Sequence, residues 1–208
     1  MLVSPRLQYL SSFYHDAIEI WDIGCDHGQL GLSFKDYPQV KAIYLVDASK
    51  SVIELLKGKV DAYIANATIF VLYSKGQDLK LESKNKKCIF IAGMGGKEIQ
   101  EILKNLESQL TVEDRIVISP HRKILELRSY LSESQYRCFT ESVIKDGPHF
   151  YQIIVLTLDQ TKDKVSSYGE SLWQTEVGKE YLIHQRAYFS KHQDKASALY
   201  VSYLNQLN

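Results

Sequence analysis

The chain has 208 residues, 45% hydrophobic and 24% charged, which is enough for one sizeable core and at most a small additional region. Its formal net charge is zero, so no basic field over the whole chain points to a nucleic-acid partner. The three cysteines form no Cys-x-x-Cys pair, which predicts a cytoplasmic protein without bound metal. No apolar run reaches the ~18 residues that span a membrane, so no membrane contact is expected.

The chain begins with the signals of a short helix followed by a central strand. Ser4-Pro5 is typical of an N-cap with proline at the first helical position, which predicts a helix within residues 1–16. The apolar run 17–21 predicts a strand, and residues 27–34 predict the next helix. In α/β proteins the end of such a strand is where ligands bind.

The turn after this strand is rich in glycine and acid but is not a dinucleotide fingerprint. Asp22, Gly24 and Gly28 give the order acidic-x-Gly-x-x-x-Gly, which disfavours NAD and resembles motif I of the class I S-adenosylmethionine (SAM) methyltransferases. A cationic sulfonium favours nearby carboxylates, and Asp22 and Asp26 supply two. An ordinary strand-turn-helix corner with two solvated acids explains the stretch as well.

The next two strands are expected to bring polar side chains towards the same crevice. Residues 41–47 predict a strand ending in Asp47, which is either a ribose-binding acid or a helix N-cap. A third strand is expected at 60–64, so that Asn66 lies in the turn after it. There its amide either reads an adenine edge or is simply a turn asparagine.

Two further strands are expected at 87–92 and 115–119, each followed by a helix. The first runs into Gly93, Gly95 and Gly96, and the second into the turn Ser119-Pro120-His121. Two strand ends opened by glycine in one sheet predict a shared crevice.

Two long apolar strands, 136–144 and 149–158, complete a seven-stranded, doubly wound sheet with an antiparallel end. A polar linker is expected at 160–168. Leu182, Phe189, Ala196 and Tyr203 then recur at every seventh position, which predicts one seam of a helix. We therefore divide the chain into a main domain, 1–159, and a C-terminal helical region, 160–208.

Three stretches together resemble the TrmK family of bacterial tRNA methyltransferases: residues 22–27, 91–96 and 151–155. The resemblance covers roughly the whole chain. It implies a Rossmann-like class I methyltransferase fold, SAM as cofactor and tRNA as partner. In that family the methyl group goes to N1 of adenine 22.

The resemblance also implies which residues form the site. The cofactor would be held by Asp22, Gly24, Cys25, Asp26, His27, Gly28, Asp47, Ala48, Asn66, Ala67, Gly93, Met94 and Gly95. The substrate would contact Arg6, Gly96, Ser119, Pro120 and His121. Asp26 is also the candidate catalytic residue, because a carboxylate near the methylated base stabilises the positive charge that develops there.

The chain departs from the family pattern in places. Ser119-Pro120-His121 stands where the family usually has Gln-Pro-Asn, Gly28-Gln29-Leu30 replaces the more usual Ala-Tyr-Leu, and the segment 47–66 and the C-terminal region are short. Two alternatives therefore stay open. One is a methyltransferase of the same fold acting on another RNA or a small molecule, and the other is a non-catalytic descendant that binds RNA or protein. The oligomeric state is left open.

Overall fold

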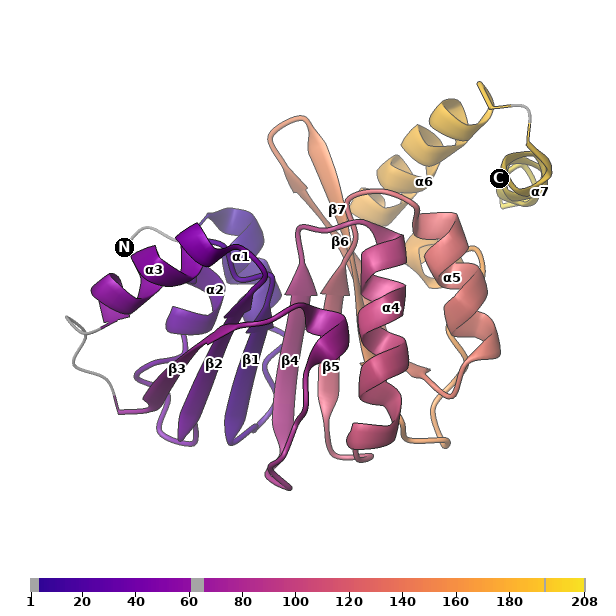
Figure 1. Cartoon of the computed structure of the whole chain (residues 1–208). Coiled ribbons are helices and arrows are strands. Elements are labelled where there is room, and N and C mark those ends of the chain that lie inside the picture. Colours follow the sequence, from indigo (N-terminus) through magenta and orange to yellow (C-terminus); the bar gives the residue numbers. More distant parts are fainter. Residues whose placement is uncertain (1–3, 61–65, 193, 208) are drawn as a thin grey trace.

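The computed structural model describes residues 4–60, 66–192 and 194–207, which form a seven-stranded sheet with helices on both faces (Figure 1). The strand order is β3-β2-β1-β4-β5-β7-β6. The strands are β1 (Glu19–Ile23), β2 (Ala42–Asp47), β3 (Thr68–Tyr73), β4 (Lys87–Ala92), β5 (Arg115–Ser119), β6 (Arg137–Asp146) and β7 (His149–Thr157). The first five are parallel, and β7 runs antiparallel to both β5 and β6, so the expected sheet is confirmed.

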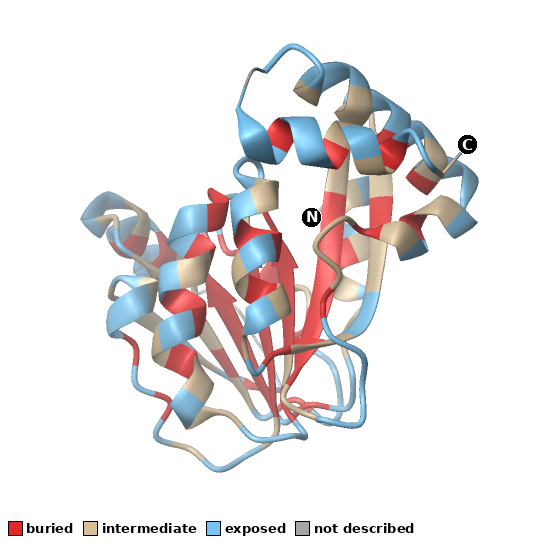
Figure 2. Cartoon of the chain, turned by 90° about the vertical axis from the view of Figure 1, so that its right-hand side faces the viewer, coloured by how far each residue is buried: buried red, intermediate tan, exposed pale blue. Residues whose placement is uncertain are grey.

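Two apolar layers cover the sheet, one on each face. The α-helices are α1 (Pro5–Ser11), α2 (Gln29–Leu32), α3 (Lys50–Val60), α4 (Gly96–Leu106), α5 (Ile124–Glu133), α6 (Glu176–Phe189) and α7 (Lys195–Leu204), and the 3-10 turns are η1 (Gly76–Asp78), η2 (Glu107–Gln109) and η3 (Glu170–Gln174). Helices α4 and α5 bury apolar side chains against one face, while α1, α2 and α3 do so against the other. Figure 2 shows the buried residues concentrated on the strands and on the inward sides of the helices.

The third strand differs from the expectation. Val60 is the last residue of α3, and residues 61–64 lie outside the described residues, so the strand expected at 60–64 is not the third strand. The strand is Thr68–Tyr73, six consecutive β-branched, aromatic or leucine residues that suit a pleated surface better than a run containing aspartate and alanine.

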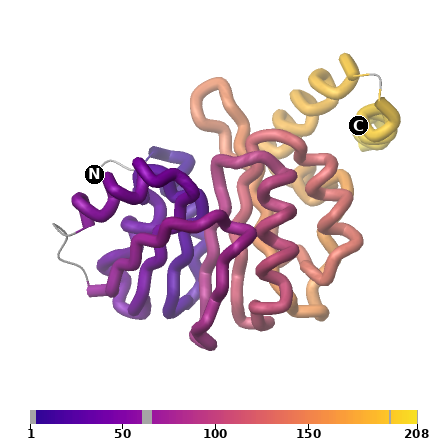
Figure 3. The backbone as a smooth tube through the Cα atoms, viewed as in Figure 1, coloured from indigo at the N-terminus to yellow at the C-terminus, as the bar shows by residue number. Residues whose placement is uncertain are grey.

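The C-terminal region also differs. The expected single helical seam is wrong, because α6 ends at Phe189 and α7 begins after the N-cap Asp194, and Ala196 and Leu199 are exposed. The expected linker is tied to the sheet, since the backbone N–H of Cys138 donates to the carbonyl of Asp163. The smooth trace in Figure 3 shows this region at the β6 end of the sheet, far from the N-terminal strands.

Asp114 connects the amino ends of β4 and β5. Its buried carboxylate accepts from the backbone N–H of Lys87 at 2.7 Å and from that of Thr111 at 2.7 Å. We expect Asp114→Ala to lower the free energy of unfolding by about 1–3 kcal/mol, because the Lys87 donor is left buried without a partner. Urea denaturation measures this. The exposed neighbour provides the control, and an equal loss in Glu113→Ala would contradict the assignment.

Candidate active site

Two glycine corners meet where β1 and β4 end side by side. Gly24 and Gly93 directly follow the paired strand ends and both have left-handed backbones, with φ of 73° and 83°. A β-carbon on Gly24 would lie 2.5 Å from the Met94 methyl group, so each corner closes on the other. Only glycine adopts this conformation freely and leaves the backbone open to a ligand. The expected shared crevice is therefore present.

The crevice is one cavity of about 360 Å³. Its lining comes from α1, from the corners after β1 and β4, from α2 and from the turn after β5: Ser4, Arg6, Leu7, Asp22, Gly24, Cys25, Asp26, His27, Gln29, Leu30, Ala92, Gly93 and His121. Eight of the residues predicted from the sequence are among them. Ser4, Leu7, Gln29, Leu30 and Ala92 were missed, although each lies within three residues of a predicted one.

Asp22 forms the buried acidic floor of the cavity. It is 5% exposed, and its Oδ2 accepts a hydrogen bond of 2.8 Å from the N–H of Gly31 in α2. Burial is the largest cause that raises the pKa of Asp22, to about 7. The hydrogen bond from Gly31 opposes this rise, and the charges of Asp47 and Asp26 contribute to it. A cation entering the cavity would favour the ionised form.

Asp47 ties the corner after β1 to the start of α3. Its two oxygens accept from the backbone N–H groups of Asp26, at 3.1 Å, and of Ser49, at 2.8 Å. The contact with Ser49 lies just before α3, which begins at Lys50, so Asp47 is not the N-cap that was the alternative for this aspartate. The contact with Asp26 also holds that residue in a left-handed conformation, with φ of 48°. The Asp26 side chain is thereby left at the cavity mouth, 72% exposed and 3.7 Å from His27 Nε2.

Arg6 and His121 form the opposite, basic side of the cavity. Arg6 projects from α1, with its guanidinium carbon 4.4 Å from the centre of the Tyr151 ring, and its buried Nε has no hydrogen-bond partner. The backbone N–H of His121 donates to the Met94 carbonyl at 3.0 Å and so joins the turns after β4 and β5. Burial, together with the charges of Arg6 and Arg122, lowers the pKa of His121. Its imidazole is therefore neutral at pH 7.

Several predicted residues surround the cavity without lining it. Gly28 starts α2 in a left-handed conformation, and a β-carbon on Gly96 would meet the backbone carbonyl of Lys123, so these two glycines serve packing. The predicted residues that lie outside the cavity lining are Gly28, Asp47, Ala48, Asn66, Ala67, Met94, Gly95, Gly96, Ser119 and Pro120. Ser119 and Pro120 are buried beneath the turn that carries His121.

The placement expected for Asn66 and Ala67 is wrong. Because β3 begins at Thr68, which pairs with Ala42 at the start of β2, both residues lie at the amino end of the strand, on the edge opposite the cavity. The Asn66 N–H donates to the Lys35 carbonyl there. The segment that reaches the cavity edge after β3 is 74–78, and the Ser74 N–H donates to the carbonyl of Asp47. Gly76, three residues after the β-prone run 68–73 ends, was the available sequence signal.

Comparison with known proteins identifies the class. Residues 3–154 match the family model described as "Methyltransferase domain", and the chain therefore belongs to that family.

Two curated proteins to which the chain is similar are named as tRNA methyltransferases. The tRNA (adenine(22)-N(1))-methyltransferase of Bacillus subtilis is 24% identical over 153 residues, which cover 74% of this chain and 64% of that protein. The tRNA methyltransferase homologue MG248 of Mycoplasma genitalium is 31% identical over 138 residues, or 66% of this chain and 61% of MG248. The matched parts thus span 61% to 64% of the length of these curated relatives.

Solved structures share the fold over the whole chain. Sp1610 of Streptococcus pneumoniae in complex with S-adenosyl-L-methionine has a TM-score of 0.81 at 20% identity and covers 99% of both chains. TrmK of M. capricolum in complex with S-adenosyl-homocysteine has a TM-score of 0.78 at 21% identity, covering 100% of this chain and 96% of that one. The chain therefore shares the fold of these structures, and the expected Rossmann-like methyltransferase fold is confirmed.

Two structural features are absent from the described part of the chain. No helix in it is long and apolar enough to cross a membrane. Nor does that part hold a group of three or more histidine, cysteine, aspartate and glutamate side chains placed to bind a metal ion.

The raised pKa of Asp22 makes stability depend on pH. An unfolded aspartate has a pKa of about 3.9, whereas the folded group has one of about 7. Between these values the folded state binds a proton that the unfolded chain has released. The free energy of unfolding should therefore fall as pH rises from about 4 to about 7. Asp22→Asn removes this titration and should become more stable relative to the wild type across the window.

Denaturation at pH 4.5, 6 and 7.5 measures this difference. Asp36→Asn alters an exposed aspartate and should keep the wild-type slope. An Asp22→Asn variant with the same pH dependence as the wild type would show that Asp22 does not titrate in this range.

Proposed function

We propose that the chain is a SAM-dependent methyltransferase that acts on N1 of adenine 22 in tRNA. The single observation that carries the proposal is the cavity in which two left-handed glycine corners meet the carboxylates of Asp22 and Asp26. Support comes from the methyltransferase-domain match, from the similar tRNA (adenine(22)-N(1))-methyltransferase of Bacillus subtilis, and from the shared fold of structures bound to SAM and its product. Such an enzyme works in the cytoplasm, with tRNA as its partner.

The open backbone and the carboxylate in the cavity suit binding of SAM. A β-carbon on Gly93 would have its nearest neighbour, His121 Cε1, 4.0 Å away, so the backbone there is open to contact. Asp22, Gly24 and Cys25 would hold the methionine end, and Asp47 the ribose. Bound SAM supplies a methyl group on a positively charged sulfur. The acidic floor at Asp22 lowers the free energy of that charge in the cavity.

The substrate side needs alignment more than proton transfer. Adenine N1 carries a free lone pair at neutral pH, so no side chain has to remove a proton first. N1 lies on the base-pairing edge, and the base must leave its stack to reach the cavity. Neutral His121 offers a flat surface beside Gly93, and Arg6 offers a cation. Holding the reactants in line at about 3–3.5 Å removes several kcal/mol of barrier.

Asp26 acts on the charge that moves during the reaction. Positive charge passes to the base as the new bond forms, and a carboxylate at the cavity mouth favours that product-like state. The bond from its N–H to Asp47 fixes the Asp26 backbone. Its carboxylate, 3.7 Å from His27 Nε2, stays exposed at the cavity mouth, where the base would lie.

Methyl transfer from labelled SAM to unmodified bulk tRNA tests the proposal. We expect label in N1-methyladenosine, and none in a tRNA carrying guanine at position 22. Binding of SAM without labelling of tRNA would indicate a methyltransferase for another RNA or a small molecule. Failure to bind SAM would indicate a non-catalytic descendant of the fold.

Asp26→Asn separates catalysis from binding. Asparagine keeps the left-handed backbone and the N–H bond to Asp47. The affinity for SAM, measured by calorimetry, should therefore change little, while kcat falls about tenfold. Asp16→Asn is the matched control, because Asp16 is also an exposed aspartate with positive φ but lies before β1, at the opposite edge of the sheet. Equal losses of affinity and kcat in Asp26→Asn would assign Asp26 to binding alone.

A further inference from the structure

The hairpin formed by β6 and β7 has two faces with different neighbours. It projects beyond the carboxyl edge of the parallel strands, beside α6 (Figure 1). Residues directly opposite in an antiparallel pair share a face. Tyr151 is opposite Ile144 on one face, whereas Phe150 is opposite Lys145 on the other.

The first face supports the basic side of the cavity. Tyr151 lies under the Arg6 guanidinium, 4.4 Å from its carbon, and 5.8 Å from the His121 ring. On the same face, the hydroxyl groups of Tyr9 in α1 and Ser142 in β6 lie 2.6 Å apart. The hairpin therefore positions two residues that line the cavity.

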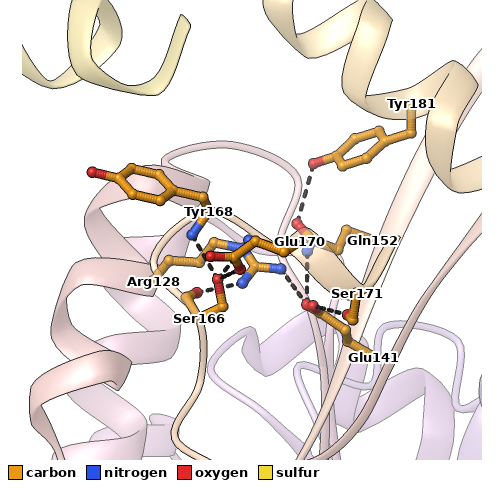
Figure 4. Close-up of polar contacts among 9 residues, drawn as sticks. Arg128, Glu141, Gln152, Ser166, Tyr168, Glu170, Ser171 and Tyr181 are labelled. Carbon is orange, nitrogen blue, oxygen red and sulfur yellow. Dashed lines mark hydrogen bonds and ion pairs between the residues drawn. The ribbon is translucent and has the colours of Figure 1, made fainter. Parts of the chain in front are cut away.

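The second face holds a buried ion pair between Arg128 of α5 and Glu141 of β6 (Figure 4). Their side chains are 2% and 4% exposed. Arg128 also donates to the Ser166 carbonyl at 2.5 Å, and Glu141 accepts from the Ser171 hydroxyl. A β-carbon on Gly169, where φ is 81°, would lie 2.7 Å from Arg128 Nη2. The segment leading into η3 is thus folded closely around the guanidinium.

The C-terminal region reaches the hairpin at two more points. With its oxygen facing Arg128, the Gln152 amide donates to the Tyr181 hydroxyl of α6 at 3.1 Å. The Phe150 ring lies 6.0 Å from the Tyr181 ring and 5.5 Å from the His184 ring. Helix α6 therefore packs along the back of the same strand whose front carries Tyr151.

We propose that Arg128 is a positioning residue: its pair with Glu141 fixes η3 and α6 against the back of the hairpin, and the hairpin thereby holds Tyr151, Arg6 and His121 in place. A buried ion pair adds little net stability but favours one arrangement of the groups around it. The consequence for methyl transfer rests on the proposed function. The C-terminal helices then hold the hairpin, and through it the cavity residues, in place for methyl transfer. This role does not depend on any contact that they make with RNA.

The test replaces both charges, because removing Arg128 alone would leave Glu141 buried and unpaired. Arg128→Met/Glu141→Leu should fold, since apolar replacements of a buried pair are tolerated. We expect SAM affinity within about twofold of wild type and a single-turnover rate, at saturating SAM and tRNA, at least about tenfold lower. Lys179→Met, which breaks an exposed ion pair within α6, is the control and should keep the wild-type rate.

A double-mutant cycle with Tyr151→Ala tests whether the effect passes through the hairpin. If it does, the charge replacement should lower the rate by less than about twofold in the Tyr151→Ala background. Losses that multiply, or a wild-type rate in Arg128→Met/Glu141→Leu, would overturn the positioning role.

A second readout does not depend on activity. The His121 ring can be titrated by NMR, with its signal assigned by comparison with His121→Gln. In Arg128→Met/Glu141→Leu its pKa should move up towards the ordinary value of about 6.5, because the hairpin relaxes and Arg6 moves away from the ring. An unchanged titration would overturn the inference. If the wild-type chain labels no tRNA, the proposed function fails, and this titration alone decides the positioning role.

Discussion

A buried carboxylate on the central strand β1, that of Asp22, constrains the geometry of the whole site. Burying the Asp22 side chain is costly unless a donor reaches it, and the donor is the N–H of Gly31. A β-carbon on Gly31 would come within 3.0 Å of the Asp22 Cβ, so α2 can pass only because that position is glycine. The chain must turn back sharply between the two residues. Left-handed backbones at Gly24, Asp26 and Gly28 make that turn and open the cavity floor.

The cavity that results is lined by two carboxylates, one guanidinium cation and one neutral imidazole. These groups belong to Asp22 and Asp26, to Arg6 and to His121. With a net charge of zero, the chain has no overall field to concentrate a nucleic acid around it. Selectivity for charge must therefore arise within this cavity, where the burial of Asp22 strengthens its interaction with a cation. This arrangement suits a reaction that moves positive charge from one bound group to another.

The fold could be predicted from the sequence wherever the information is local. Apolar runs ending in glycine or acid marked β1, β2 and β4, and the two long apolar runs at 136–144 and 149–158 marked the antiparallel pair. The error at β3 came from counting Val60 as a strand residue when it ends α3, and it carried Asn66 to the wrong edge of the sheet. The Arg128–Glu141 pair had no local signal, because tertiary contacts between α5 and β6 create it.

The seven-residue spacing near the C-terminus led to the wrong prediction of one helical seam, because a periodic pattern does not show where a helix ends. The apolar surface is real, but it is shared by separate elements: Val143, Leu172, Tyr181, Leu182, Tyr200 and Leu204 form one buried cluster across β6, η3, α6 and α7. Apolar contact of this kind is not directional, so it stabilises docking without fixing its angle. The polar contacts around Arg128 are directional. The apolar cluster therefore supplies most of the free energy of docking, while the buried ion pair determines the orientation that reaches Tyr151 on the other face of the hairpin.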